Sequence, residues 1–179
     1  GYNQKLRTQQ IIKEGDSMYS LQNLNDYIEA VSQKKHMLIF LSVKDSANKH
    51  WDKFNKKLLN LESDVAEKWR RSYIAVVDTD AELQYEKLNA NAKKIVYQFE
   101  FKDKQDDEKV NYAYVSSHAM GVGKYTKSAI VINGQQYSLN RRGLNIVVYS
   151  KEESRVIDSI VVDLWADPNL TVKREEDFK

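Results

Sequence analysis

The sequence predicts an α+β domain in which mostly antiparallel strands are flanked by two helices. Two segments, at about residues 20–33 and 51–68, repeat apolar residues at spacings of three and four, as helices with one buried face do. The second half of the chain consists of short apolar or alternating runs joined by turn signals, which indicate strands in hairpins. Helices and strands do not alternate regularly along the chain, so the pattern disfavours a doubly wound parallel sheet.

The first predicted elements follow one another from residue 16 to residue 78. Residues 1–15 are mainly polar and are expected to form an arm outside the domain. The helix at 20–33 is followed by His36–Val43, an uninterrupted apolar run that predicts a strand covered on both faces. The helix at 51–68 is followed by a second short apolar strand at Tyr73–Val77.

Hairpins are expected to supply the remaining strands. Residues 79–114 form a connecting hairpin, whose turn is the charged stretch 102–109. Asn133-Gly134 marks the next hairpin, because both central residues of a tight type I′ turn need positive φ. A third hairpin joins runs that begin at Gly143 and Arg155. The domain is expected to end near residue 167, with residues 168–179 as a loose charged tail.

Composition excludes several classes of function. The 179 residues carry a formal net charge of +2 and no cysteine. A chain of this length forms one domain with a sizeable core. The missing cysteines exclude disulfide scaffolds, zinc ribbons and thiol catalysts. The balanced charge argues against nucleic acid as a partner, and no apolar stretch is long enough to insert into a membrane. No signal segment is visible, so localisation stays open.

Local motifs for catalysis or cofactor binding are weak. Met120–Thr126 resembles a phosphate-binding loop, but His118 and Tyr125 stand where that loop needs a glycine and a hydroxyl. The remaining histidines, His36 and His50, lie at no metal-ligand spacing. We therefore expect no cofactor and no metal, and we do not expect an enzyme, although a triad assembled in space leaves no local signature.

One group of side chains suggests a binding site. Asp45 ends the first buried strand, and Trp69-Arg70 lies just before the second. If these strands are neighbours, the three side chains share one rim. An indole can cover the apolar face of a sugar ring, while a carboxylate and a guanidinium can fix its hydroxyls. The alternative is a structural Asp–Arg pair with Trp69 half in the core.

Four short motifs together resemble the ILEI/PANDER domain. They are Arg142–Val147, with the sequence RGLNIV, then Val162–Trp165, Val43–Asp45 and Trp69-Arg70. Related domains occur in the interleukin-like EMT inducer family, in the stem of the O-mannose N-acetylglucosaminyltransferase, and in some bacterial polysaccharide and phage tail-fibre proteins. The resemblance implies a compact β-sandwich-like α+β domain. The secreted relatives contain disulfides, whereas this chain has no cysteine, so it resembles the bacterial or phage members more. An extracellular, virion or cell-envelope location is favoured.

The order of these motifs departs from the family. Residues 16–78 correspond to the family's second half and residues 115–167 to its first, which suggests a circular permutation with 79–114 as the new connection. In a circularly permuted domain, segments that follow one another in the original chain order must still lie close together in the structure. We therefore expect Ser17–Leu21 to lie close to Trp165–Leu170. The alternative is that the chain joins halves of two consecutive domains and completes them by swapping.

The resemblance also implies a function. The transferase stem domain binds β-linked sugar without catalysing a reaction, and its contacts carry over to Asp45, Trp69 and Arg70. Arg71 replaces an aspartate of the family, so one acceptor is lost. Arg142 is expected to close a structural hydrogen bond, and Gly143 to serve backbone geometry.

Two hypotheses follow for what this domain does. The first is a noncatalytic carbohydrate-binding module that recognises a β-linked glycan for a larger glycan-related system. The second is a structural or protein-interaction domain, of tail-fibre or secreted signalling type, whose partner is a protein. A fully buried Trp69 would exclude the sugar platform.

Overall fold

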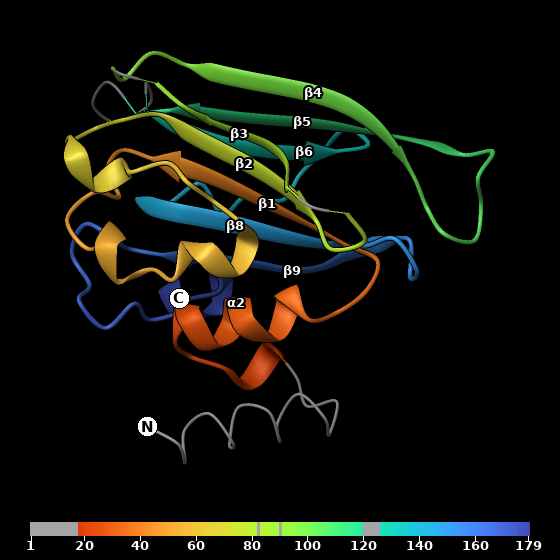
Figure 1. Cartoon of the computed structure of the whole chain (residues 1–179), viewed down its shortest axis with the longest axis horizontal. Helices are drawn as coiled ribbons and strands as arrows, with labels where there is room; N and C mark the ends of the chain where they lie inside the picture. The colour runs from red at the N-terminus through yellow and green to blue at the C-terminus, as the bar shows by residue number, and fades with distance from the viewer. Residues whose placement is uncertain (1–17, 82, 90, 120–125) are drawn as a thin grey trace.

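Two antiparallel sheets form the framework of the domain (Figure 1). The computed structural model describes residues 18–81, 83–89, 91–119 and 126–179, so the arm predicted over 1–15 lies outside the described residues. One sheet has the order β3-β2-β1-β8-β9 and the other β4-β5-β6-β7. The strands are β1 (Met37–Lys44), β2 (Tyr73–Asp78), β3 (Leu83–Leu88), β4 (Ile95–Lys102), β5 (Val110–His118), β6 (Lys127–Ile132), β7 (Gln135–Gln136), β8 (Gly143–Ser150) and β9 (Arg155–Val162). The predicted sandwich-like α+β class is confirmed.

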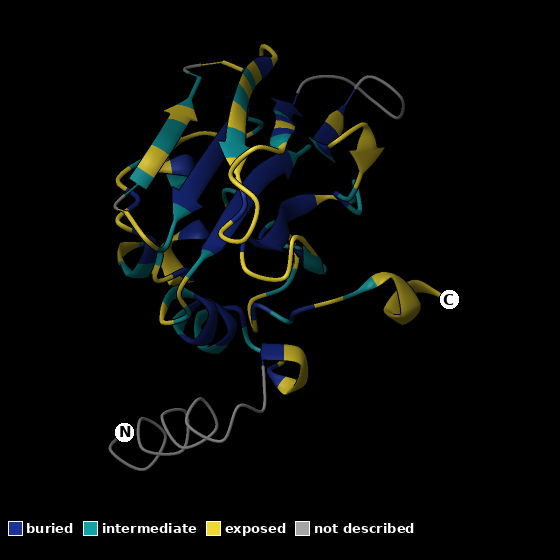
Figure 2. Ribbon diagram, turned by 90° about the vertical axis from the view of Figure 1, so that its right-hand side faces the viewer, coloured by how far each residue is buried: buried dark blue, intermediate teal, exposed yellow. Residues whose placement is uncertain are grey.

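The five-stranded sheet is covered on both faces, which explains the unbroken apolar run of β1. Ile39 and Leu41 point to a core shared with the helical segments. Leu38 and Phe40 point to a second core, between the two sheets. All four side chains are at most 1% exposed. Figure 2 shows the buried central strands surrounded by exposed loops and outer elements.

The first predicted helix is present but short. Its α-helical part, α2, runs from Leu24 to Ser32, after a 3-10 turn, η1, at Met18–Ser20. The side chain of Asn23 caps α2, because its Oδ1 accepts from the backbone N–H groups of the second and third following residues. The apolar side of α2 packs into the core beneath β9 and β8.

The helix predicted over 51–68 is wrong. The segment forms three separate 3-10 turns, η2 (Trp51–Lys53), η3 (Lys56–Leu59) and η4 (Val65–Glu67). Phe54 is extended, and Asn60 adopts a left-handed conformation with φ of 57°, so the chain turns twice where a helix would continue. The apolar residues that suggested a helix are still largely buried, because each turn contributes one or two of them to the same core.

The predicted hairpin turns are present, but the connection over 79–114 is not one hairpin, because β3 pairs with β2 in the five-stranded sheet. β4 pairs with β5 across the charged turn, and β8 pairs with β9. Asn133 and Gly134 have φ values of 50° and 84°, as their tight turn requires. Gly143, at the start of β8, has φ of 111°, and a Cβ there would collide with the carbonyl oxygen of Val162. Its backbone role is therefore confirmed.

The C-terminal tail is not loose, contrary to prediction. Leu170 and Val172 are 3% and 6% exposed and belong to the core next to α2. Lys173 forms a backbone bridge with Val161. A final 3-10 turn, η6, follows at Glu175–Phe178. Only two apolar side chains anchor the segment, which is too few to produce a recognisable pattern in the sequence.

Residues 22–24 lie beside residues 170–172, next to the two segments, Ser17–Leu21 and Trp165–Leu170, that are expected to be close. The N–H of Leu24 donates to the carbonyl of Leu170 at 2.9 Å, and the N–H of Val172 donates to the carbonyl of Gln22 at 2.7 Å. Asn23 forms an antiparallel bridge with Thr171. Ser17 itself lies outside the described residues.

Candidate functional site

Strand topology gathers four charged residues at one end of the five-stranded sheet. Because neighbouring strands are antiparallel, the ends of β1 and β9 lie beside the beginnings of β2 and β8. Arg70 comes just before β2, Asp45 just after β1, Arg142 just before β8 and Asp163 just after β9. In strand order their charges alternate, and we call these four residues the charged row.

The two ion pairs of the charged row, Arg142–Asp163 and Arg70–Asp45, differ in the number of hydrogen bonds between their side chains. Arg142 donates two hydrogen bonds to Oδ2 of Asp163, at 3.1 and 2.8 Å. The hydrogen bond that Arg142 donates to Asp163 raises the pKa of Arg142. Partial burial opposes the rise, and the negative charges of Asp163 and Asp45 add to it. Nε of Arg70 lies 3.4 Å from Oδ1 of Asp45 but forms no hydrogen bond, although this nitrogen is buried. The Asp45–Arg70 pair is therefore open.

Two tryptophan rings lie beside the open pair. Trp69 is 52% exposed, and the guanidinium carbon of Arg70 lies 4.2 Å from the centre of its ring. The Trp165 ring, from the loop after β9, is 6.3 Å from the Trp69 ring between centroids. Lys49 Nζ is 5.9 Å from the Trp165 ring. Trp69 is therefore not fully buried, so the condition for a sugar platform is met.

The backbone holds both members of the open pair in left-handed conformations. Asp45 has φ of 59° and Arg70 has φ of 54°. Aspartate tolerates this region better than most residues, whereas arginine gains nothing from it locally. The N–H of Asp45 donates to Oγ1 of Thr126 at 2.8 Å, which fixes the turn after β1.

Arg71, which stands where the resembled family has an aspartate, is engaged elsewhere. Its Nε donates to the carbonyl of Asn89 at 3.0 Å, and its Nη1 pairs with Glu67 at 3.0 Å. Its side chain is only 12% exposed. The residue therefore ties the approach to β2 to neighbouring segments and adds no group to the charged row.

All three residues predicted from the sequence thus lie together, and Arg142 makes the expected structural hydrogen bond. Sequence reasoning does not place Trp165 in the site. Its motif is recognisable, but its place beside Trp69 depends on the pairing of β8 with both β1 and β9, which the sequence does not reveal.

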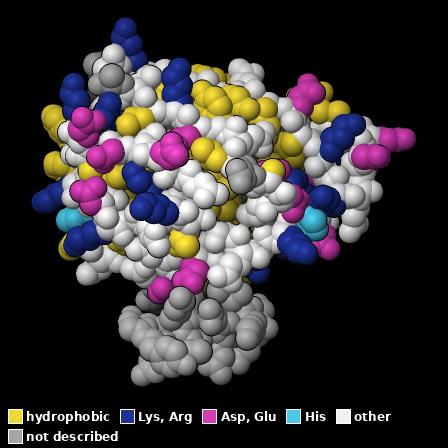
Figure 3. All heavy atoms as spheres, in the orientation of Figure 1, with side chains coloured by type: hydrophobic (Ala, Val, Ile, Leu, Met, Phe, Trp, Pro, Cys, Tyr) yellow, Lys and Arg dark blue, Asp and Glu magenta, His cyan; other side chains and the backbone are white. Residues whose placement is uncertain are grey.

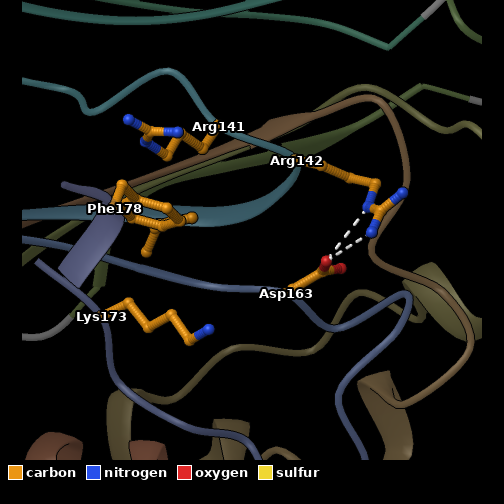
Figure 4. A pocket seen from close by; sticks show the side chains of 6 residues that line it. Arg141, Arg142, Asp163, Lys173 and Phe178 are labelled. Carbon is orange, nitrogen blue, oxygen red and sulfur yellow. Dashed lines mark hydrogen bonds and ion pairs between the residues drawn. The ribbon is translucent and has the colours of Figure 1, made fainter. Parts of the chain in front are cut away.

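A small pocket opens on the other side of the Arg142–Asp163 pair. Its volume is about 220 Å³. Figure 4 shows the Arg142–Asp163 pair at one end and Arg141, Phe178 and Lys173 at the other. Val161 of β9 completes the lining. Sequence reasoning missed this pocket because Lys173 and Phe178 come from the segment predicted to be loose.

The surface gives little sign of other chemistry. In the described part of the chain, no group of three or more His, Asp or Glu is placed to hold a metal ion. No helix of the described residues has the length and apolar character needed to cross a membrane. Figure 3 shows basic and acidic side chains interspersed on one face of the molecule.

No protein-family model, curated protein or solved structure matches the chain.

Proposed function

We propose that this domain is a noncatalytic carbohydrate-binding module that recognises a β-linked glycan, as part of a larger glycan-related system. The observation that carries the proposal is the half-exposed Trp69 ring beside the open Asp45–Arg70 pair. A sugar ring presents one apolar C–H face and a rim of hydroxyls. The indole supports stacking, and the open pair supports hydrogen bonds to the rim.

The open pair suits hydroxyl recognition because both partners keep unused hydrogen-bonding capacity. The side chains of Arg70 and Asp45 are 33% and 30% exposed. A guanidinium offers five N–H donors and a carboxylate offers several acceptor sites, and their single contact here uses few of them. Bridging both groups by one pair of hydroxyls would cost little, because partly exposed ion pairs contribute only about 0–1 kcal/mol.

Binding without catalysis is favoured by how the carboxylates are arranged. Glycoside hydrolysis requires two carboxyl groups that face each other across the scissile bond. In the charged row, Asp163 is tied to Arg142 by two hydrogen bonds, and Asp45 lies next to Arg70. Each carboxylate thus faces a guanidinium, an arrangement suited to holding a ligand.

Ligand-observed NMR with β-linked glycans tests the proposal. We expect saturation transfer to the glycan in the unmodified domain, and its loss in Asp45→Ala, Arg70→Ala and Trp69→Ala. Two matched controls remove similar exposed groups elsewhere. Arg155→Ala breaks an exposed pair with Glu153, and Tyr112→Ala removes a 59% exposed ring from β5. Both should bind normally.

Binding that survives Asp45→Ala and Arg70→Ala would contradict the site. Absence of binding to any glycan would favour the second hypothesis, a structural or protein-interaction domain without sugar binding.

We also propose that the chain is a circularly permuted ILEI/PANDER-type domain. The pairing of residues 22–24 with 170–172 supports this, because it closes the junction that permutation requires. The pairing of β1 with β8 supports it further, since the two parts of the chain complete one sheet without a second copy. A variant that joins the present ends and begins in the 102–109 turn should therefore fold cooperatively; failure to fold would count against the permutation.

A further inference from the structure

The pocket beside the charged row has a surplus of positive charge. We call it the basic pocket and define it by its lining residues, Arg141, Arg142, Val161, Asp163, Lys173 and Phe178. Asp163 neutralises Arg142 through two hydrogen bonds. Arg141 reaches Glu175 only at 3.5 Å, in a pair that is 39% and 52% exposed. Against partial burial, backbone hydrogen bonds lower the pKa of Asp167, and the charge of Lys173 adds to the lowering. Lys173 Nζ nevertheless forms no ion pair or hydrogen bond within 4 Å with any other described side chain, so it can still pair with a ligand.

Arg141 also has a donor to spare. Its Nε is buried and has no hydrogen-bond partner in the described structure. The Arg141 guanidinium carbon lies 3.6 Å from the centre of the Phe178 ring, and Lys173 Nζ lies 5.8 Å from it. The same ring thus positions both cations at one end of the pocket (Figure 4). An unused guanidinium donor next to an unpaired ammonium favours a carboxylate-like anion.

The fold fixes the backbone of both cationic residues before any ligand arrives. The backbone N–H of Arg141 donates to Oδ1 of Asn145 at 3.1 Å, and its carbonyl accepts from Nδ2 of the same residue at 2.8 Å. Asn145 is fully buried. Lys173 exchanges two backbone hydrogen bonds with Val161, at 2.9 and 3.0 Å. A fixed backbone at Arg141 and Lys173 lowers the entropy cost of placing their side chains beside an anion.

The size of the pocket limits the ligand. Its volume of about 220 Å³ is below the roughly 300–1,000 Å³ of pockets for drug-sized ligands. It suits one small group, such as a single acidic ring. Arg142 belongs both to the basic pocket and to the charged row, so a ligand on Trp69 and Asp45 can continue into the pocket.

From this continuity we infer that the glycan is acidic and that the basic pocket takes the carboxylate of a uronic acid residue through Lys173 and Arg141. The inference rests on the proposed function, because it assumes that a neighbouring sugar occupies the surface of Trp69. The inference specifies the glycan of the proposed function as a β-linked chain that carries carboxylate groups.

Calorimetric titration with two oligosaccharides of equal length tests the inference. One is a neutral β-linked gluco-oligosaccharide, and the other carries alternating glucuronate residues. We expect the uronate chain to bind about tenfold more tightly at low salt, because a charge-assisted contact replaces a neutral one. Lys173→Met should remove most of this preference, because only Arg141 remains to bind the carboxylate, and should leave neutral binding unchanged. The matched control is Lys109→Met, on the exposed turn between β4 and β5, and it should keep the preference.

The outcomes separate the inference from the proposed function. Neutral binding without a preference for uronate would overturn the inference and leave the carbohydrate module intact. Failure of both oligosaccharides to bind would overturn both. Uronate binding that is lost in Lys173→Met but survives Asp45→Ala and Trp69→Ala would show an isolated acid pocket, and would overturn the idea of one continuous site. A shift of the Phe178 ring resonances with the uronate chain alone would support the inference independently.

Discussion

Two aspartate–arginine pairs in this domain, Asp158–Arg174 and Asp45–Arg70, differ in burial and in the number of hydrogen bonds between their side chains. Asp158 and Arg174 meet through two hydrogen bonds of 3.0 and 2.8 Å, and Tyr27 donates a third at 2.9 Å. The side chains of Asp158 and Arg174 are only 6% and 19% exposed. Asp45 and Arg70 make one contact of 3.4 Å without a hydrogen bond and are about a third exposed.

The difference indicates that an ion pair has a structural role when it is buried and its hydrogen-bonding groups are already paired, and can bind a ligand when it is exposed and they are not. Burial, reinforced by the charge and hydrogen bond of Asp158, raises the pKa of Tyr27 well above its usual value, so this hydroxyl remains a donor at every working pH. The Asp158–Arg174 pair, which we call the closed pair, is largely buried and joins α2, β9 and the C-terminal segment. The open pair, Asp45–Arg70, contains no hydrogen bond between its side chains, so both side chains keep hydrogen-bonding groups for a ligand.

Breaking the closed pair should have the largest effect on stability. Arg174→Ala would leave Asp158 buried without its counter-charge, and we expect a loss of about 3 kcal/mol in the free energy of unfolding. Urea denaturation followed by circular dichroism measures this loss. A change below about 1 kcal/mol would show that the pair does not hold the C-terminal segment in place.

The ion-pair cluster of Asp80, His36 and Lys151 should make the stability of the domain depend on pH. Partial burial raises the pKa of Asp80, but hydrogen bonds from His36 and Lys151 outweigh it and leave the pKa well below its usual value. Because the folded-state pKa is lowered, the stabilisation is complete above the unfolded value of about 3.9 and disappears as the pH falls below it.

Asp80→Asn should therefore be less stable than the unmodified domain at pH ~6, by about 1 kcal/mol after allowance for solvent screening. The difference should shrink as the pH is lowered from ~4 to ~2. Denaturation midpoints at several pH values measure it. A difference that stays constant over this range would assign the effect to packing instead of charge.

Breaking the open pair should have the smallest effect on stability. Arg70→Ala removes a partly exposed contact, and we expect a change within about 0.5 kcal/mol, while glycan binding is lost. Thermal unfolding beside the NMR binding assay separates the two effects. If Arg70→Ala destabilises the domain as much as Arg174→Ala does, the two pairs have the same structural role and the comparison fails.

Much of the fold could be predicted because it depends on local patterns. The doubly covered strand β1 appears as an unbroken apolar run, and Asn133-Gly134 marks its turn directly. The segment 51–68 could not be predicted, because residues that bury side chains in one core from successive turns imitate helical spacing. Asn60, which breaks the segment with a left-handed conformation, has no unique signature.

The candidate site was partly predictable for a similar reason. Asp45, Trp69 and Arg70 could be grouped by assuming that the first two apolar strands are neighbours, which the pairing of β1 with β2 confirms. Trp165 and Lys173 could not be grouped with them. Their positions depend on long-range pairings, of β8 with β1 and of Lys173 with Val161, that join segments far apart in sequence.

The closed pair also sets the order in which a newly synthesised chain can complete its fold. Asp158 is 131 residues from Tyr27 in sequence, and its arginine comes 16 residues later still. While the ribosome still holds Arg174, Asp158 would have to enter the interior without its counter-charge, which is costly. The packing of α2 against β9 therefore waits until Arg174 has emerged, and the incomplete domain exposes apolar surface until then.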